Sequence, residues 1–186
     1  MSEQLKKLPT GPNGPELYAG FNTINTHQVY DPGVERWSDA APIPGPARDH
    51  MGIAVLDGKI HLVGGRTADT VDNIDRHDVY DPKTDTWTIA APLPKPRSSG
   101  AAAVLDGKLV YAGGECNAGG AGAPGQTFED VTAYDPKSDR WSDLPRLQKP
   151  RHAFGAATVG GTAYFVGGAL SCGGGASTDL LALTSK

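Results

Sequence analysis

Three arginines recur along the chain and are the residues best suited to bind an anionic ligand. Arg48, Arg97 and Arg151 each lie within two residues of a proline. A guanidinium group can hold a planar carboxylate through two parallel hydrogen bonds. Grouped around one opening, the three would form a cationic ring that captures an acidic peptide or a sugar acid. The structural alternative is that each arginine bonds loop carbonyls or an acidic neighbour, and its recurrence in every unit favours that alternative.

Polar residues close to these arginines complete the predicted ligand-binding site. The further candidates are His50, His152, Glu115 and Glu129, with Asp49, Asp69, Asp72 and Asp130 as nearby acidic partners. A catalytic site would need a nucleophile beside a base, or a Gly-x-Ser-x-Gly elbow, and the sequence offers neither convincingly. No catalytic residue is assigned, and the site is predicted to bind its ligand without transforming it.

The two cysteines follow glycine pairs in neighbouring units and could form a disulfide or a soft metal pair. Cys116 and Cys172 can be bridged only if their Cα atoms lie within about 7 Å, and equivalent loops of neighbouring units are often farther apart. We therefore predict free thiols.

Patterns for metals and phosphates are weak throughout. The five histidines lack metal-ligand spacing, and His61 aligns with a tyrosine in another unit, which favours a packing role. Four aspartates spaced by three residues lack the calcium-loop pattern and are predicted to form a solvated acidic loop; they are Asp69, Asp72, Asp75 and Asp78. No phosphate-loop lysine follows the glycine runs. We predict neither a metal nor a cofactor.

The elements that must position these residues are repeats. The pattern Tyr-Asp-Pro-x-x-x-x-Trp occurs three times at intervals of about fifty residues, and a Gly-Gly pair belongs to each unit. The repeated residues are Tyr30, Trp37, Tyr80, Trp87, Tyr134 and Trp141, with Gly64-Gly65, Gly113-Gly114 and Gly167-Gly168. Such a period indicates a repeat architecture.

The unit after Arg97 divides into four short strands, a to d. Apolar or alternating runs at 100–105, 108–112, 131–134 and 140–142 are separated by turn residues. Asp106-Gly107 predicts a two-residue hairpin, and Asp135-Pro136 predicts the turn between strands c and d. The unit is therefore predicted to be a four-stranded antiparallel meander, and the chain to be all-β.

The Gly-Gly pair followed by Tyr and then Trp resembles the kelch repeat of β-propeller proteins, over residues 17–183. The resemblance implies a propeller with blades at about 17–40, 48–90, 97–144 and 151–186, after an N-terminal segment, 1–16, that is irregular or a closing strand. The first blade lacks strand a, and the last stops before strand d.

About three and a half blades are fewer than the six or seven of typical kelch relatives, so an open, partial propeller is favoured. Three explanations stay open. The chain is a fragment, or a second copy completes the ring as a homodimer, or residues 5–8 close a small four-bladed ring. Light scattering would test the homodimer.

In such a meander the b–c and d–a loops emerge on the same face. The long b–c loops span 66–77, 115–130 and 169–178, and the d–a loops carry the three arginines. Length variation on one face of a repeat protein often marks the functional surface. We therefore place the predicted site on this face.

The resemblance implies an interaction module that binds an acidic peptide or an anionic sugar, since kelch domains use this face for acidic segments. The alternative is a carbohydrate-active enzyme similar to sialic-acid epimerases or to galactose oxidase, although the copper site of the latter cannot be matched. A net charge of −4 argues against nucleic acid as a partner, and no apolar run predicts a membrane span. With no visible signal peptide, a cytoplasmic location is expected.

Overall fold

A computed structural model of the chain describes residues 10–11, 14–15, 23–67, 72–115, 127–172 and 174–184. Every regular element in these ranges is a β-strand, which confirms the all-β prediction. In the described ranges there is accordingly no helix long and apolar enough to cross a membrane.

Two complete four-stranded blades form the middle of the molecule, each an antiparallel meander whose strands follow chain order. The blade that we number 2 contains β6 (Gly52–Leu56), β7 (Lys59–Val63), β9 (His77–Asp81) and β10 (Thr86–Ile89). Blade 3 contains β11 (Ala101–Leu105), β12 (Lys108–Ala112), β13 (Val131–Asp135) and β14 (Arg140–Leu144). The strands of blade 3 are the a, b, c and d strands predicted from the sequence, with ends shifted by at most two residues.

The outer sheets have fewer strands. Blade 4 contains β15 (Gly155–Val159), β16 (Thr162–Val166) and β17 (Leu180–Thr184), and blade 1 contains β3 (His27–Asp31) and β4 (Arg36–Ala40). Two short ladders were not predicted: β1 (Thr10–Gly11) with β2 (Gly14–Pro15), and β5 (Arg48–Asp49) with β8 (Arg66–Thr67). Residues 17–20 and 5–8, proposed as a first strand b and a closing strand, lie outside the described residues.

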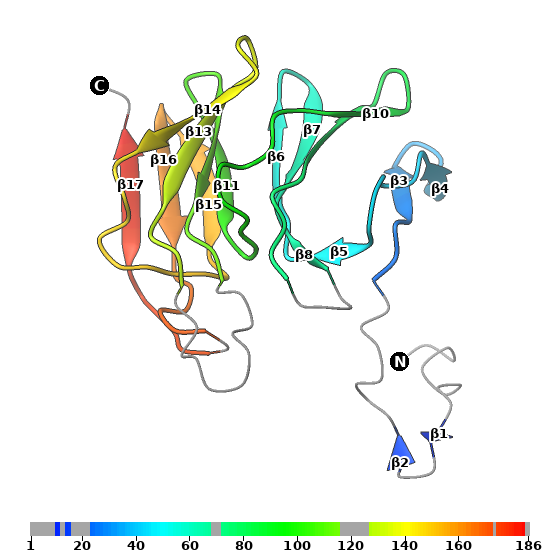
Figure 1. The fold of residues 1–186 in the computed structure, drawn as a ribbon. Coiled ribbons are helices and arrows are strands. Elements are labelled where there is room, and N and C mark those ends of the chain that lie inside the picture. The colour runs from blue at the N-terminus through cyan, green and yellow to red at the C-terminus, as the bar shows by residue number, and fades with distance from the viewer. Residues whose placement is uncertain are drawn as a thin grey trace.

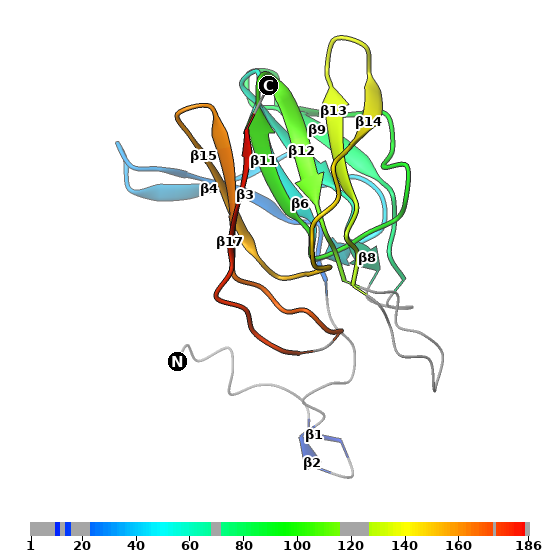
Figure 2. The same ribbon diagram turned by 90° about the vertical axis from the view of Figure 1, so that its left-hand side faces the viewer.

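The blades lie side by side, and the innermost strands of blades 2, 3 and 4 are in contact, β6 with β11 and β11 with β15 (Figure 1). The described sheets form an open arc, as expected for a partial propeller. Figures 1 and 2 both show the b–c and d–a loops at one end of the strands and the tight a–b and c–d turns at the other. The loops therefore share one face, which we call the loop face.

The tight turns have the predicted chemistry. Asp57 and Asp106 begin a–b hairpins with φ of 52° and 50°, the left-handed region that a two-residue turn of this type requires. In the c–d turns an aspartate accepts a backbone hydrogen bond two residues on, at 2.9 Å from the nitrogen of Lys83 to Asp81 Oδ1. The Asp-Pro motif thus ends strand c by bonding its own turn.

The second and third Tyr-Asp-Pro-x-x-x-x-Trp repeats bind the preceding blade through a set of contacts that we call the tryptophan clamp. Trp87 Nε1 donates to the carbonyl of Ala41 at 2.8 Å, and the Ala41 nitrogen donates to Asp85 Oδ1 at 2.8 Å. The Tyr80 hydroxyl holds the same carboxylate oxygen at 2.8 Å. The same contacts recur at the next junction, with Trp141, Ala91, Asp139 and Tyr134. The repeated motif therefore sets how the blades stack.

In the first two glycine pairs, the second glycine bonds the segment that enters the following blade. Gly114 donates from its backbone nitrogen to the Arg151 carbonyl at 2.9 Å, and Gly65 does the same to Arg97 at 3.0 Å. Gly113 has a φ of 64°, and a Cβ there would collide with the Arg151 carbonyl oxygen. Glycine is needed at this junction because two backbones meet without room for a side chain.

His61 and His77 form a buried pair between blades 2 and 3, and the predicted packing role of His61 is confirmed. His77 Nδ1 lies 3.1 Å from the Ala91 carbonyl, which assigns the proton to Nδ1 and leaves Nε2 as the acceptor for His61 Nδ1 at 2.8 Å. Burial lowers the pKa of His61 to about 4 and also lowers the pKa of His77. The pair is therefore neutral at physiological pH.

Candidate ligand-binding face

The three recurrent arginines are buried beneath the loop face. The exposed fractions of Arg48, Arg97 and Arg151 are 5%, 0% and 1%. Each precedes strand a of its blade, and its guanidinium group bonds at the start of strand c of the same blade or just before it. The three side chains are thus held inside the blades and are not displayed as a cationic ring on the surface.

Arg97 shows the contacts most completely. Its two terminal nitrogens donate to the carbonyls of Gly113 at 2.9 Å and Asp130 at 2.8 Å, and to Thr132 Oγ1 at 2.8 Å. The guanidinium carbon also lies 4.9 Å from the centre of the Tyr111 ring. These are the contacts of the structural alternative, in which the arginine bonds loop carbonyls.

Each of the other two arginines binds a carboxylate near the start of strand c, Asp78 inside β9 and Asp179 just before β17. Arg48 pairs with Asp78 at 2.6 Å, and Arg151 pairs with Asp179 at 2.8 Å while also donating to the Gly167 carbonyl at 3.0 Å. Hydrogen bonds from Arg151 and from Ser177 lower the pKa of Asp179. In blades 3 and 4 the arginine therefore links the end of strand b to the start of strand c, whereas Arg48 binds strand c through Asp78.

A second group of polar residues lies where the entries to blades 2 to 4 meet, and we call it the entry cluster. Arg66, on β8, donates to Asp49 Oδ1 at 2.9 Å and to Glu115 Oε2 at 3.4 Å, so it links two acidic side chains from successive blades. Ser99 donates to the same Glu115 oxygen at 3.3 Å. Burial acts to raise the pKa of Asp49, but the hydrogen bonds from Arg66 and His50 outweigh it and hold this pKa below its usual value.

Both candidate histidines belong to the entry cluster. His50 Nδ1 lies 2.8 Å from Asp49 Oδ1 and its side chain is 38% exposed, so it is open to a ligand. His152 is buried; its Nε2 contacts the Ser171 carbonyl at 3.0 Å, and its Nδ1 lies 3.9 Å from Glu115 Oε1. Of the predicted site residues, the structure therefore brings together His50, Glu115, His152 and Asp49. Asp69 lies outside the described residues.

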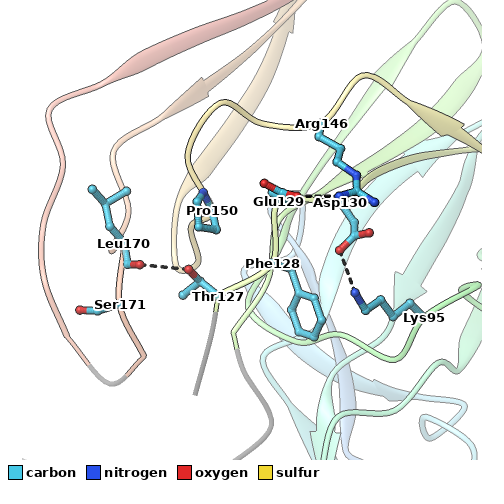
Figure 3. Close-up of a pocket in the computed structure, with 9 residues that line it drawn as sticks. All are labelled: Lys95, Thr127, Phe128, Glu129, Asp130, Arg146, Pro150, Leu170 and Ser171. Carbon is cyan, nitrogen blue, oxygen red and sulfur yellow. Dashed lines mark hydrogen bonds and ion pairs between the residues drawn. The ribbon is translucent and has the colours of Figure 1, made fainter. Parts of the chain in front are cut away.

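A pocket of about 530 Å³ lies on the loop face between blades 3 and 4. It is lined by Lys95, Thr127, Phe128, Glu129, Asp130, Arg146, Pro150, Leu170 and Ser171 (Figure 3). The lining comes from two d–a segments, the end of one b–c loop and the start of the next. The Thr127 hydroxyl donates to the Leu170 carbonyl at 3.0 Å and joins the two blades across the pocket.

Two ion pairs line this pocket. Lys95 pairs with Asp130 at 3.2 Å and lies 4.7 Å from the centre of the Phe128 ring, while Arg146 pairs with Glu129 at 2.7 Å. The cation is the more exposed partner in both pairs: 55% for Lys95 against 25% for Asp130, and 68% for Arg146 against 44% for Glu129. A ligand that approaches the pocket meets the ammonium and guanidinium groups first.

Sequence reasoning found Glu129 and Asp130 but missed the cations that face them. Lys95 and Arg146 lie in the same proline-containing d–a segments as the three recurrent arginines. Their position in the sequence could have identified them, because the d–a segments lie at the loop face. Arg66 was missed because nothing in the sequence predicted β8.

Two interpretations from the sequence are corrected. Cys172 is disulfide-bonded, so the prediction of a free thiol is wrong for this residue, while Cys116 lies outside the described residues. In the aspartate series, Asp72 and Asp75 are exposed, but Asp78 is fully buried between Arg48 and Arg76. Asp78 pairs with the buried guanidinium of Arg48 at 2.6 Å, which explains why Asp78 does not belong to a solvated loop.

The described blades, their clamps and their shared loop face define an open-arc β-propeller. Residues 17–179 match the model of the KLHDC2/KLHL20/DRC7 Kelch-repeats domain, and the chain belongs to the kelch-repeat family. It is 32% identical to human Kelch-like protein 33 over 128 residues, which are 68% of this chain and 22% of that protein. It is 33% identical to Kelch-like protein terF of Aspergillus terreus, over 80% of this chain and 33% of that protein.

Another relative is the mouse influenza virus NS1A-binding protein homolog, 37% identical over 41% of this chain and 12% of that protein. The solved structure of YjhT matches with a TM-score of 0.75 and 20% identity, over 87% of this chain and 50% of that one. That likeness supports the fold. The chain spans a third or less of the length of these curated relatives and half of the matched structure.

Proposed function

We propose that the chain is a protein-interaction module whose loop face binds a carboxylate-rich ligand in the pocket between blades 3 and 4. The observation that carries the proposal is the asymmetry of the ion pairs, in which Lys95 and Arg146 are more exposed than Asp130 and Glu129. The family supports the interaction role, since one relative is named for binding a viral protein.

A third pair extends the same arrangement along the loop face. Lys149 lies 3.8 Å from Asp179, with exposed fractions of 61% and 35%. Lysine and arginine side chains from the d–a segments thus overlie carboxylates that precede strand c. Arg146 donates from Nη1 to Glu129 Oε1, and its guanidinium group has further N–H donors that can bind a second carboxylate.

An acidic peptide is the favoured ligand because Phe128 gives the pocket an apolar wall beside its cations. Phe128 lies under the Lys95 ammonium, where a peptide side chain can pack against the ring while its carboxylate reaches the charge. An anionic sugar offers the same carboxylate chemistry without that apolar contact. The binding experiment distinguishes the acidic peptide from the anionic sugar.

The test measures the affinity of fluorescent Asp/Glu-rich peptides and of carboxylated oligosaccharides for the chain. Replacing both Lys95 and Arg146 by alanine is expected to weaken peptide binding by at least about tenfold, and raising the salt concentration should weaken it further. Lys137→Ala is the matched control, since Lys137 is exposed in a c–d turn on the opposite face. Both variants should melt near the wild-type temperature, because exposed ion pairs contribute only about 0–1 kcal/mol.

Equal affinity in the wild type and the double variant would place the ligand elsewhere. Preferential binding of the oligosaccharide, abolished by the same two substitutions, would keep the pocket but reassign its ligand. Turnover of a sugar acid would contradict the binding-module function and favour the enzymatic alternative.

A further inference from the structure

A second pocket lies between the two complete blades, at the end of the strands opposite the loop face. Its volume is about 380 Å³, within the range of small-molecule sites, roughly 300–1,000 Å³. The lining comes from all four strands of blade 2 and its a–b hairpin, and from strand c and the c–d turn of blade 3 (Figure 1). The polar and charged lining residues that carry the argument are Asp57, Lys59, His61, Tyr134 and Asp139.

A chain of buried hydrogen bonds fixes where the protons of His61 lie. The Ala91 carbonyl can only accept, so His77 carries its proton on Nδ1 and accepts at Nε2. His61 Nδ1 donates to that nitrogen at 2.8 Å, and the neutral ring therefore bears a lone pair on Nε2. Burial lowers the pKa of His61 to about 4, so this form prevails at physiological pH. Among the described residues, none donates to His61 Nε2.

The fold does not need an imidazole at this position. The matching residue of strand b in blade 3 is Val110, which has the same register against strand a and is 1% exposed. His61 is similarly buried, at 4%, yet its ring lines the pocket. Burying a polar atom without a partner is unfavourable, and a valine avoids that cost. Packing alone therefore does not explain an imidazole whose acceptor nitrogen is left unbonded.

The charges around the pocket favour a cation. Asp57 is exposed at the a–b turn, and Asp139 accepts the Tyr134 hydroxyl at one oxygen, at 2.8 Å. The lining cation, Lys59, pairs with Asp81 at 3.3 Å, which offsets its charge. The pocket thus combines an imidazole acceptor with two carboxylates.

We propose that this pocket binds an alkylammonium group, which donates an N–H to His61 Nε2 while Asp57 and Asp139 balance its charge. Val79 and Ile89, which also line the pocket, give its hydrocarbon part an apolar surface. The ammonium can belong to a free primary amine or to a lysine side chain of a partner protein. The site is independent of the carboxylate ligand proposed for the loop face.

The test titrates butylammonium into the ¹⁵N-labelled chain and follows the imidazole nitrogens by nuclear magnetic resonance. We expect the Nε2 resonance of His61 to move in a saturable way, while the resonances of His50, on the loop face, stay unchanged. Butyltrimethylammonium keeps the charge but has no N–H, and it should bind at least about tenfold more weakly. N-acetyl-lysine amide carries the same ammonium on a peptide backbone.

Two variants assign the contacts. His61→Val, which introduces the residue found at the matching position of blade 3, should abolish the difference in affinity between the two cations. Asp57→Asn should weaken butylammonium about two- to fivefold. Asp106→Asn is the matched control, because Asp57 and Asp106 begin equivalent hairpins with φ of 52° and 50°, which asparagine tolerates, and Asp106 lies outside the pocket.

Equal affinity of the wild type for the two cations would overturn the proposal, and so would a response at His50 without one at His61. Tighter binding of butyrate than of butylammonium would also overturn it, because Lys59 would then determine the charge of the ligand. Tighter binding of N-acetyl-lysine amide than of butylammonium would support the site with a partner's lysine as its source. The reverse order would support it with a free amine.

Discussion

At the scale of single residues, the buried polar side chains stabilise the fold by bonding groups at the ends of strands. Arg97 is fully buried, and it donates to two carbonyls and a hydroxyl near the ends of two strands. A charge can be buried only where its hydrogen bonds are largely satisfied, so these acceptors and the guanidinium depend on one another. By contrast, a ligand can reach the cations of the exposed ion pairs on this face, such as Lys95 and Arg146.

Arg97→Ala is expected to lower the free energy of unfolding by about 3–5 kcal/mol, since it leaves buried acceptors without donors. Arg140→Ala, an exposed arginine of β14 in the same blade, should change it by less than about 0.5 kcal/mol. Chemical denaturation followed by circular dichroism measures both. A stable Arg97→Ala variant with lost ligand binding would contradict the structural role and restore the ligand-contacting one.

The buried histidine pair predicts an acid-sensitive junction between blades 2 and 3. The unfolded chain protonates His61 near its ordinary pKa of 6.5, but the folded chain does so only near 4. Unfolding therefore takes up protons in this window, and stability is full above pH 6.5 and declines by about 2 kcal/mol as the pH falls toward 4. The aspartates with lowered pKa values, such as Asp139, lose their stabilising effect below this window.

Melting temperatures between pH 7 and 4 test this window. His61→Val introduces the residue that the matching strand of blade 3 carries, Val110, and should flatten the decline, while His77 continues to contribute some of it. An unchanged slope in His61→Val would show that other groups cause the acid sensitivity.

At the scale of elements, the tryptophan clamp couples each blade to the one before it. Trp87 and Trp141 donate to a carbonyl of the preceding blade, whereas Trp37 is 64% exposed and packs on Tyr30 within its own hairpin. Among the described residues, the tryptophan of this motif thus bonds a preceding blade in two repeats and is exposed in the other. Trp37 is therefore a control for the energy that the clamp contributes.

Trp87→Phe and Trp141→Phe should each cost about 1–2 kcal/mol, because each loses an interblade hydrogen bond and some packing. Trp37→Phe should cost less than about 0.5 kcal/mol. Denaturation of the three variants under one set of conditions makes the comparison. Equal losses in all three would mean that the tryptophans stabilise their own hairpins and not the junctions.

At the scale of the whole molecule, the arc separates two kinds of surface. The loop face gathers ion pairs and the charged pocket, while the flanks of the arc expose apolar side chains, among them Trp37 and Val55 on one side and Val166 and Leu180 on the other. Charged surfaces bind ligands whose affinity depends on salt, and apolar edges bind strands and sheets. Completion of the ring by a second copy stays a prediction that light scattering tests, and so does the cytoplasmic location.

Much of the fold could be predicted because the repeat is local in sequence. Asp-Gly and Asp-Pro turns, alternating strands and the glycine pairs each act within a few residues, so the predicted strand at 108–112 agrees with β12 to the residue. The shared loop face followed from the meander, since antiparallel strands joined in order must alternate the ends at which their loops emerge. The candidate site was predicted less well, because its residues come from different blades.

The sequence by itself determined the kelch repeat, the strands and the face on which the loops meet. Only the tertiary structure decided that Arg48, Arg97 and Arg151 turn into their blades while Lys95 and Arg146 remain exposed. The physical reason is that the sequence period shows which residues occupy equivalent positions in the repeat. The direction of a long cationic side chain depends instead on hydrogen-bond acceptors from strands that are distant in the sequence.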